Sequence, residues 1–202
     1  MITYLRDYAN ATTAVGYFFA VCALFFVLNG RVELGLAAIM WTWFLDHWDG
    51  LIARRTMQRR RPGFADFGKS FDGFVDFIHG VLFPAIVIIQ MGNGSPLSFV
   101  ASLALVLTGG IRLSYFENFG LTSDARFTGI PVSYDAPLLA ILVLARPAIP
   151  TELFMPLLCG AFLLLSALHV NMSIRVPAIR GKAIPVATLL ALIASFALAA
   201  RA

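Results

Sequence analysis

Charged side chains are scarce in this sequence. Asp, Glu, Lys and Arg make up 13 % of the 202 residues and hydrophobic residues make up 59 %, whereas about 25 % of a soluble globular domain is charged. The mean hydropathy is +0.83. This composition excludes an ordinary water-soluble domain, so we expect lipid to surround most of the chain.

Cysteine is nearly absent as well. Cys22 and Cys159 lie inside apolar runs without the spacing of a metal or redox motif, so we interpret both as core residues. A cleavable signal peptide is not evident, because no small-residue cleavage site follows a short apolar core after Arg6 and Asp7. We therefore expect the first apolar run to be a membrane span.

Long apolar runs are what the sequence has in abundance. A helix needs about 20 apolar residues to cross the hydrocarbon core, and backbone polar groups in lipid favour helices over open strands. The runs do not alternate as barrel strands do. The sequence predicts an all-α integral membrane protein, one domain over residues 1–202, with about six to seven transmembrane helices and a polar active-site cavity facing the cytoplasm. The runs are 11–29, 33–53, 70–91, 96–116, 130–147, 152–173 and 183–200, the last of which could instead be a re-entrant or surface helix.

The cations predict the orientation, because Lys and Arg concentrate on the cytoplasmic side. With the N-terminus inside, only Arg31, Arg146 and Arg201 of the 15 Lys and Arg lie on the far side. We expect a multi-pass protein of the cell (inner) membrane. The cations expected on the cytoplasmic side are Arg6, Arg54, Arg55, Arg59, Arg60, Arg61, Lys69, Arg112, Arg126, Arg175, Arg180 and Lys182.

Interfacial residues are also predicted around the second run. Arg59, Arg60 and Arg61 are expected to face anionic lipid, each contributing about 1 kcal/mol. Three tryptophans near the same membrane face are expected to form an interfacial belt. They are Trp41, Trp43 and Trp48.

Acidic residues gather where the second run ends and the third begins. Charges near membrane depth are costly and mark function. One helix face of the second run, at positions i, i+3, i+4 and i+7, carries Asp46, Asp49, Gly50 and Ala53. Every fourth residue of the following helix belongs to a second stripe, made of Gly68, Asp72, Asp76 and Gly80. Two adjacent helices can therefore direct four carboxylates at one point.

Four carboxylates at one point repel one another unless a cation offsets their charge. An oxygen-only set without cysteine or a histidine cluster suits Mg²⁺ or Mn²⁺, with Ca²⁺ also possible, rather than zinc. Gly50 and Ala53 leave room beside the acids for a large ligand, which we expect to be a pyrophosphate. A purely structural pairing of a lone intramembrane Asp with an Arg explains four acids poorly.

These residues resemble the CDP-alcohol phosphotransferases, which carry D-x2-D-G-x2-A-R and, after a gap, G-x3-D-x3-D. The gap between Arg54 and Gly68 holds 13 residues, is rich in arginine and is longer than is common in the family. All fixed positions are present, as Asp46, Asp49, Gly50, Ala53, Arg54, Gly68, Asp72 and Asp76.

The resemblance implies a role for each of these residues. Asp46, Asp49 and Asp72 would hold one or two metal ions on the pyrophosphate of CDP-diacylglycerol. Asp76 would contact a metal ion and also act as the base on the incoming hydroxyl. The CDP-lipid site would contain Gly50, Ala53, Arg54 and Gly68, together with Asn10 and Thr13 of an N-x2-T element that opens the first span. The resemblance also implies a homodimer with no nucleic-acid partner.

Three further segments resemble the phosphatidylserine synthase branch, which implies L-serine as the acceptor. They are residues 112–118, Gly129-Ile-Pro131 and residues 171–177. Glu117 and His79 depart from that branch, so glycerol 3-phosphate, inositol phosphate and choline stay open as acceptors.

Two residues are predicted to bind the acceptor. Arg112 could hold a serine carboxylate by a bidentate fork, or it could extend toward the headgroups. Asp135 could meet the serine ammonium, or it could pair with Arg112. His79 shares the face of Asp76 and is interpreted mainly as a packed polar residue, whereas His47 is expected to point away from the acids.

Two other classes of protein compete with this prediction. A membrane prenyltransferase would carry two widely separated acidic motifs, whereas these acids lie in one helical hairpin. A carboxylate-based ion transporter would show repeats or broken helices at the midplane. Neither pattern is visible in the sequence.

Overall fold

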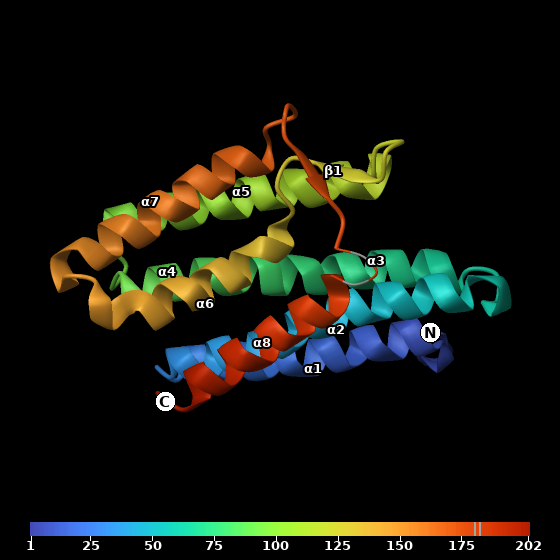
Figure 1. The fold of residues 1–202 in the computed structure, drawn as a ribbon, viewed down its shortest axis with the longest axis horizontal. Coiled ribbons are helices and arrows are strands. Elements are labelled where there is room, and N and C mark those ends of the chain that lie inside the picture. Colours follow the sequence, from blue (N-terminus) through green and yellow to red (C-terminus); the bar gives the residue numbers. More distant parts are fainter. Residues whose placement is uncertain (180, 182) are drawn as a thin grey trace.

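A computed structural model describes residues 1–179, 181 and 183–202 as an elongated helical bundle. Helices run roughly along its long axis, and the two termini lie at opposite ends of that axis (Figure 1). Arg180 and Lys182, two of the cations predicted on the cytoplasmic side, lie outside the described residues.

The chain begins with a helical hairpin. A short 3₁₀ helix, Ile2–Arg6, leads into α1 (Tyr8–Leu28), which packs against α2 (Val32–Thr56). The side chain of Asp7 caps α1, because it accepts hydrogen bonds from the backbone N–H groups of Ala9 and Asn10. This cap fixes the helix start beside the end of α2, where the acidic stripe lies.

The third apolar run forms one helix with an irregular centre. It consists of α3 (Phe64–Asp76), a π-helical segment, η3 (Phe77–Leu82), and α4 (Phe83–Met91). The wider π turn begins directly after Asp76, and such turns inside α-helices are frequent at functional sites. The second acidic stripe therefore ends where the backbone changes its winding.

The second half of the chain combines helices with a small strand pair. The helices are α5 (Pro96–Phe119), α6 (Asp135–Ala145), α7 (Thr151–His169) and α8 (Ala183–Ala199), with 3₁₀ turns at Val132–Tyr134, Arg146–Ala148 and, in the first half, Met57–Arg59. Strands β1 (Arg126–Thr128) and β2 (Arg175–Pro177) pair in antiparallel fashion, with Phe127 opposite Val176. The purely helical prediction missed this ribbon, since three-residue strands leave no periodic pattern.

Four helices in the described part of the chain are long and apolar enough to cross a membrane. They are α1, the continuous helix Phe64–Met91, α5 and α7. These four helices agree with the predicted multi-pass helical bundle, whereas the structure does not show six to seven full crossings. The predicted run 130–147 forms an α-helix over only 11 residues, and α8 has 17 residues. Both begin near the middle of the long axis and run toward one end (Figure 1).

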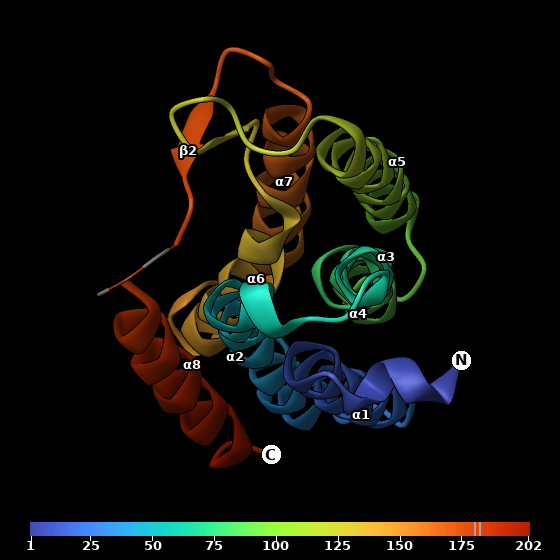
Figure 2. The ribbon, with the colours of Figure 1, turned by 90° about the vertical axis from the view of Figure 1, so that its right-hand side faces the viewer.

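Viewed along the long axis, α8 lies outside α2, and α6 lies toward the centre (Figure 2). The Nε1 of Trp41 donates to Ser195 Oγ at 3.1 Å, and the Nε1 of Trp48 donates to Thr188 Oγ1 at 3.0 Å. These two hydrogen bonds therefore connect α2 to α8. Trp43 is only 5 % exposed, so its predicted place in an interfacial belt is wrong, whereas Trp41 and Trp48 are partly exposed.

Candidate metal and substrate site

The two acidic stripes converge as the sequence predicted. One ligand atom from each of Asp46, Asp49 and Asp72 falls within 4.8 Å of the others. Asp46 also belongs to a second set with Asp76 and His79, which meets the same limit. Asp46 and Asp49 come from α2, whereas Asp72 and Asp76 come from α3, so the cluster joins two separate helices.

The carboxylates form few hydrogen bonds of their own. Asp72 Oδ1 and Asp76 Oδ1 are buried and have no hydrogen-bond partner among the described residues. Buried polar atoms are nearly always paired, and adjacent carboxylates repel one another. A hard divalent cation would satisfy both requirements, and oxygen atoms are the ligands that Mg²⁺ and Mn²⁺ prefer. The residues present therefore fit such an ion.

One carboxylate of the cluster is held from the first helix. Thr13 Oγ1 donates to Asp49 Oδ2 at 2.5 Å, and both residues are buried. The hydroxyl also lies 3.1 Å from the backbone oxygen of Ala9. A hydroxyl carries one proton, and the shorter distance favours Asp49 as its acceptor. The sequence placed Thr13 beside the nucleotide, whereas here its hydroxyl orients a predicted metal ligand.

A first cavity, of about 310 Å³, opens beside this pair. Five of the six residues predicted to bind the CDP-lipid line it, together with Asp49 and Asp72. These five are Asn10, Thr13, Gly50, Ala53 and Gly68. Arg54, the sixth, lines a different cavity. The structure thus brings the predicted donor residues together with the acids.

Asn10 links three chain segments at the edge of this first cavity. Its Nδ2 donates to the backbone oxygens of Tyr4 and Phe64, and its Oδ1 accepts from Arg60 at 2.8 Å. A Cβ on Gly68 would lie 2.3 Å from Asn10 Oδ1. Packing against Asn10 therefore requires glycine at position 68.

Arg60 was expected to face anionic lipid, and this prediction is wrong. Its guanidinium donates to both carboxylate oxygens of Asp7 at 3.0 Å, and its side chain is 6 % exposed. Because the long loop between the two acidic helices supplies this arginine, the loop is tied back onto the start of α1.

A second cavity, of about 210 Å³, is lined by three of the acids, Asp46, Asp72 and Asp76. Arg112 of α5 lines it and is 4 % exposed, and its Nε has no hydrogen-bond partner among the described residues. The guanidinium lies 5.7 Å from the Phe116 ring centroid and 5.5 Å from that of Phe127. Other lining residues include Asp46, Asp72, Asp76, His47, Gly50, Arg54, Ser133 and Tyr134. Arg112 is therefore buried in the cavity wall, and the predicted alternative in which its side chain extends to the lipid headgroups is wrong.

Asp135 was also predicted to bind the acceptor, yet it does not line the 210 Å³ cavity. Its Oδ2 lies 3.2 Å from His169 Nε2, and both residues are buried. The alternative pairing of Asp135 with Arg112 is therefore wrong. His169 Nδ1 lies 2.8 Å from the backbone oxygen of Ile130, so the pair connects α6, α7 and the segment that leads into the cavity wall.

Sequence reasoning missed several residues around the acids. His47 was expected to point away, but its Nδ1 lies 3.4 Å from Asp46 Oδ2 and it lines the 210 Å³ cavity. His79 belongs to one of the two ligand sets. Phe127 and Tyr134 reach the cavity from the β1 strand and the 3₁₀ turn before α6. Only their closeness in sequence to the segment Gly129-Ile-Pro131 could have indicated them.

The sequence profile described as CDP-alcohol phosphatidyltransferase matches residues 6–201. The chain belongs to this family. The two converging acidic stripes thus lie in a member of the CDP-alcohol phosphatidyltransferase family, and the aspartates, the flanking small residues and Arg54 are the residues that carry the resemblance.

Several relatives within the phosphatidyltransferase family carry more specific names. The phosphatidylcholine synthase of Agrobacterium fabrum is 32 % identical over 118 residues, covering 57 % of this chain and 45 % of that protein. That of Rhizobium meliloti is 32 % identical over 114 residues, covering 55 % and 43 %. The CDP-diacylglycerol–serine O-phosphatidyltransferase of Helicobacter pylori is 29 % identical over 140 residues, covering 68 % and 57 %. The chain spans about half the length of these relatives, and their names divide between two products.

Proposed function

We propose that this phosphatidyltransferase moves the phosphatidyl group of CDP-diacylglycerol onto a small amino alcohol and releases CMP. The observation that carries the proposal is the cluster of four carboxylates, each of which lines one or both of two cavities. The 310 Å³ cavity contains the predicted donor residues, and the 210 Å³ cavity contains Arg112. Asp72 lines both, so the two substrates would meet beside the acids.

The proposed metal site consists of Asp46, Asp49, Asp72 and Asp76, holding one or two Mg²⁺ or Mn²⁺ ions. Such ions would offset the negative charge of the pyrophosphate and of the leaving CMP. Thr13 would keep Asp49 oriented toward the ion, since its hydroxyl bonds the second oxygen of that carboxylate. Asn10, Gly50, Ala53 and Gly68 would surround the nucleotide, and Arg54 would contact it from the other cavity.

Asp76 is the proposed general base. It lines the cavity that also contains Arg112, and its Oδ1 has no hydrogen-bond partner among the described residues. The carboxylate would take the proton of the acceptor hydroxyl as the hydroxyl oxygen attacks the phosphorus that carries diacylglycerol. The bond from this phosphorus to the bridging oxygen breaks, and CMP leaves with the electron pair. This is a direct transfer, so no covalent enzyme intermediate is needed.

L-serine is our first proposed acceptor. The buried guanidinium of Arg112 lines the 210 Å³ cavity, and its Nε lacks a partner among the residues that the structure describes. A carboxylate is the partner that an arginine fork matches best. Arg112 also lies over Phe116 and Phe127, which leaves these ring faces covered. Asp135 remains a proposed partner for the serine ammonium, which would require a rearrangement of its contact with His169.

Choline is the second candidate, and two observations favour it. Tyr134 also lines the cavity, and among the described residues no arginine lies over its ring. An aromatic ring face attracts a quaternary ammonium ion. Relatives from Agrobacterium fabrum and Rhizobium meliloti are named phosphatidylcholine synthases. Glycerol 3-phosphate and inositol phosphate rank lower, because among the described residues Arg54 and Arg112 are the cations that line this cavity.

The proposal is tested with purified protein, labelled CDP-diacylglycerol, Mn²⁺ or Mg²⁺ and a panel of acceptors, with products separated by lipid chromatography. We expect phosphatidylserine and CMP from serine. Arg112→Gln should raise the KM for serine about tenfold or more while changing the KM for choline little, because a charge-assisted hydrogen bond contributes about 1.5–3 kcal/mol. A product with choline and none with serine would transfer the proposal to choline. Absence of CMP release with every alcohol tested would contradict the proposed transferase activity and favour the ion-transporter hypothesis.

We also propose a homodimer with its active site on the cytoplasmic side of the cell membrane. The uneven distribution of Lys and Arg supports the orientation, and the family resemblance supports the dimer. Gln58 lies exposed in the loop between the two acidic helices. A cysteine introduced there should react with an impermeant reagent in inverted vesicles and not in intact cells, and light scattering in detergent would give the oligomeric state.

A further inference from the structure

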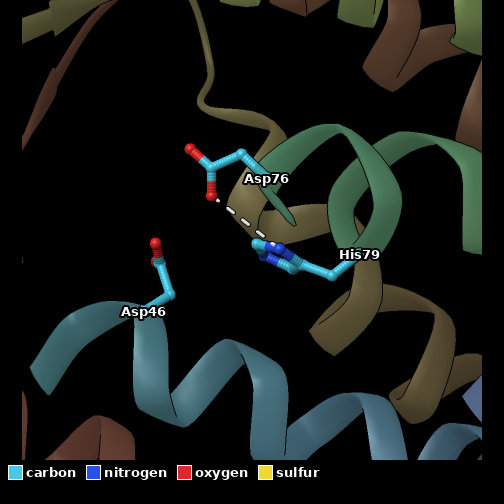
Figure 3. Close-up of side chains that lie close together, drawn as sticks. All are labelled: Asp46, Asp76 and His79. Carbon is cyan, nitrogen blue, oxygen red and sulfur yellow. Dashed lines mark ion pairs between the residues drawn. The ribbon is translucent and has the colours of Figure 1, made fainter. Parts of the chain in front are cut away.

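We infer that His79 supplies a nitrogen ligand to the metal cluster, beside Asp46 and Asp76. This inference rests on the proposed function, because it assumes that the acids hold an ion. Ligand atoms from these three residues lie within 4.8 Å of one another. Figure 3 shows the two carboxylates and the imidazole ring facing a common space, with Asp46 on α2 and the other two on the facing helix.

The contact that His79 makes with the backbone favours the tautomer in which Nε2 is able to bind a metal ion. Nδ1 lies 3.0 Å from the backbone oxygen of Val75. A carbonyl oxygen only accepts hydrogen bonds, so this contact needs the proton on Nδ1 and leaves a lone pair on Nε2. Metal-binding histidines usually have this arrangement, in which the second ring nitrogen donates to a carbonyl or carboxylate.

The remaining ring nitrogen has nothing to bind within the described protein. His79 is 0 % exposed, and its Nε2 has no hydrogen-bond partner among the described residues. Nδ1 is 3.8 Å from Asp76 Oδ1, which is too long for a hydrogen bond. A packed polar residue would be expected to satisfy both nitrogens. A divalent ion beside Asp46 and Asp76 would accept the lone pair and also reduce the repulsion between the acids.

The local backbone fixes this ring beside the acids. His79 lies inside the π-helical segment that begins directly after Asp76. The next residue, Gly80, packs so closely against the 3₁₀ turn before α6 that a Cβ would lie 2.7 Å from the backbone oxygen of Val132. The turn therefore has little freedom to move the imidazole away from the cluster.

A nitrogen ligand changes which metal the site prefers. Mg²⁺ favours oxygen ligands and keeps its waters, whereas imidazole suits transition metals. The set formed by Asp46, Asp49 and Asp72 contains oxygen ligands alone, so it does not favour a transition metal over Mg²⁺ in this way. We therefore expect the chain to bind Mn²⁺ more tightly than Mg²⁺. Replacement of His79 should weaken Mn²⁺ binding about tenfold and affect Mg²⁺ binding much less.

The test is pulsed electron paramagnetic resonance of Mn²⁺ bound to the full chain in detergent, in a buffer without nitrogen. A coordinated imidazole gives ¹⁴N modulation, and labelling with ¹⁵N-histidine should shift its frequencies. The signal should disappear in His79→Gln, and also in His79→Phe, while His47→Gln should retain it. Size-exclusion profiles and circular dichroism show which of the two His79 variants keeps the fold, and that variant supplies the comparison.

Each result separates this inference from the proposed function. Bound Mn²⁺ without histidine modulation overturns the role of His79 and leaves the carboxylate site intact. Modulation that survives in a folded His79 variant and vanishes in His47→Gln also overturns the inference, because it assigns the nitrogen to His47. Absence of Mn²⁺ binding to the wild-type chain would remove the metal site and the proposed function together.

Discussion

The hydrogen bond between Thr13 and Asp49 gives the sharpest quantitative prediction. Replacement of Thr13 by valine keeps the shape of the side chain and removes its only donor. The 2.5 Å distance between Thr13 Oγ1 and Asp49 Oδ2 is in the range of charge-assisted O–H···O⁻ bonds. Such bonds contribute about 1.5–3 kcal/mol, and a factor of ten corresponds to about 1.4 kcal/mol. We therefore expect Thr13→Val to weaken metal binding about ten- to a hundredfold.

This magnitude agrees with a separate expectation, since loss of a residue that orients a metal ligand typically costs about 10–100-fold in metal affinity or activity. The assay has two parts. Isothermal titration with Mn²⁺ gives the dissociation constant directly, and CMP release as a function of Mn²⁺ concentration should show the same shift. Because Thr13 orients Asp49 and is not assigned to the reacting atoms, saturating metal should restore most of the turnover.

Thr13→Ser is the matched control, because it keeps the hydroxyl and should retain near-normal Mn²⁺ affinity. An unchanged metal dependence in Thr13→Val would refute the role of this bond. If turnover stayed low at saturating metal while the CDP-diacylglycerol KM rose, Thr13 would instead contact the nucleotide, as the sequence first suggested. The two explanations therefore predict different kinetic changes from the same variant.

Three further outcomes are expected. Asp76→Asn should retain CDP-diacylglycerol binding and lower kcat about 10²–10⁴-fold, because it removes the proposed base; near-normal turnover in the same CMP-release assay would contradict that role. Gly68→Ala should destabilise the fold by about 1–3 kcal/mol in thermal unfolding, since its methyl group would lie 2.3 Å from Asn10 Oδ1. Gly73→Ala on the same helix is the control, because a Cβ at that position would have nothing within 4 Å of it, and equal destabilisation of both variants would contradict the packing argument. Removal of divalent metal with EDTA should abolish CMP release, and added Mn²⁺ should restore it; activity that persists in EDTA would contradict a required metal.

Local patterns were enough to predict the acidic half of the site. Residues that repeat every third or fourth position share a helix face wherever the helix packs, so the stripes of α2 and α3 were visible in the sequence alone. Two consecutive apolar helices joined by a single loop are neighbours in a bundle, and the convergence of Asp46, Asp49 and Asp72 agrees with that arrangement. Composition likewise determined that this is a membrane helical bundle, because the backbone in lipid has few alternatives.

Tertiary packing decided the rest, because it depends on segments that are distant in sequence. Asp135 pairs with His169, which is 34 residues away in the sequence, and no local pattern indicated that contact. His47 reached the acids through a side-chain direction that spacing did not predict, whereas His79 was placed on the face of Asp76 but not identified as a ligand. The π turn after Asp76 also altered the regular helical repeat. The sequence by itself determined which acids meet in this member of the family. Only the fold decided which neutral and cationic side chains surround them, since those contacts arise from packing between helices and not from the period of any one helix.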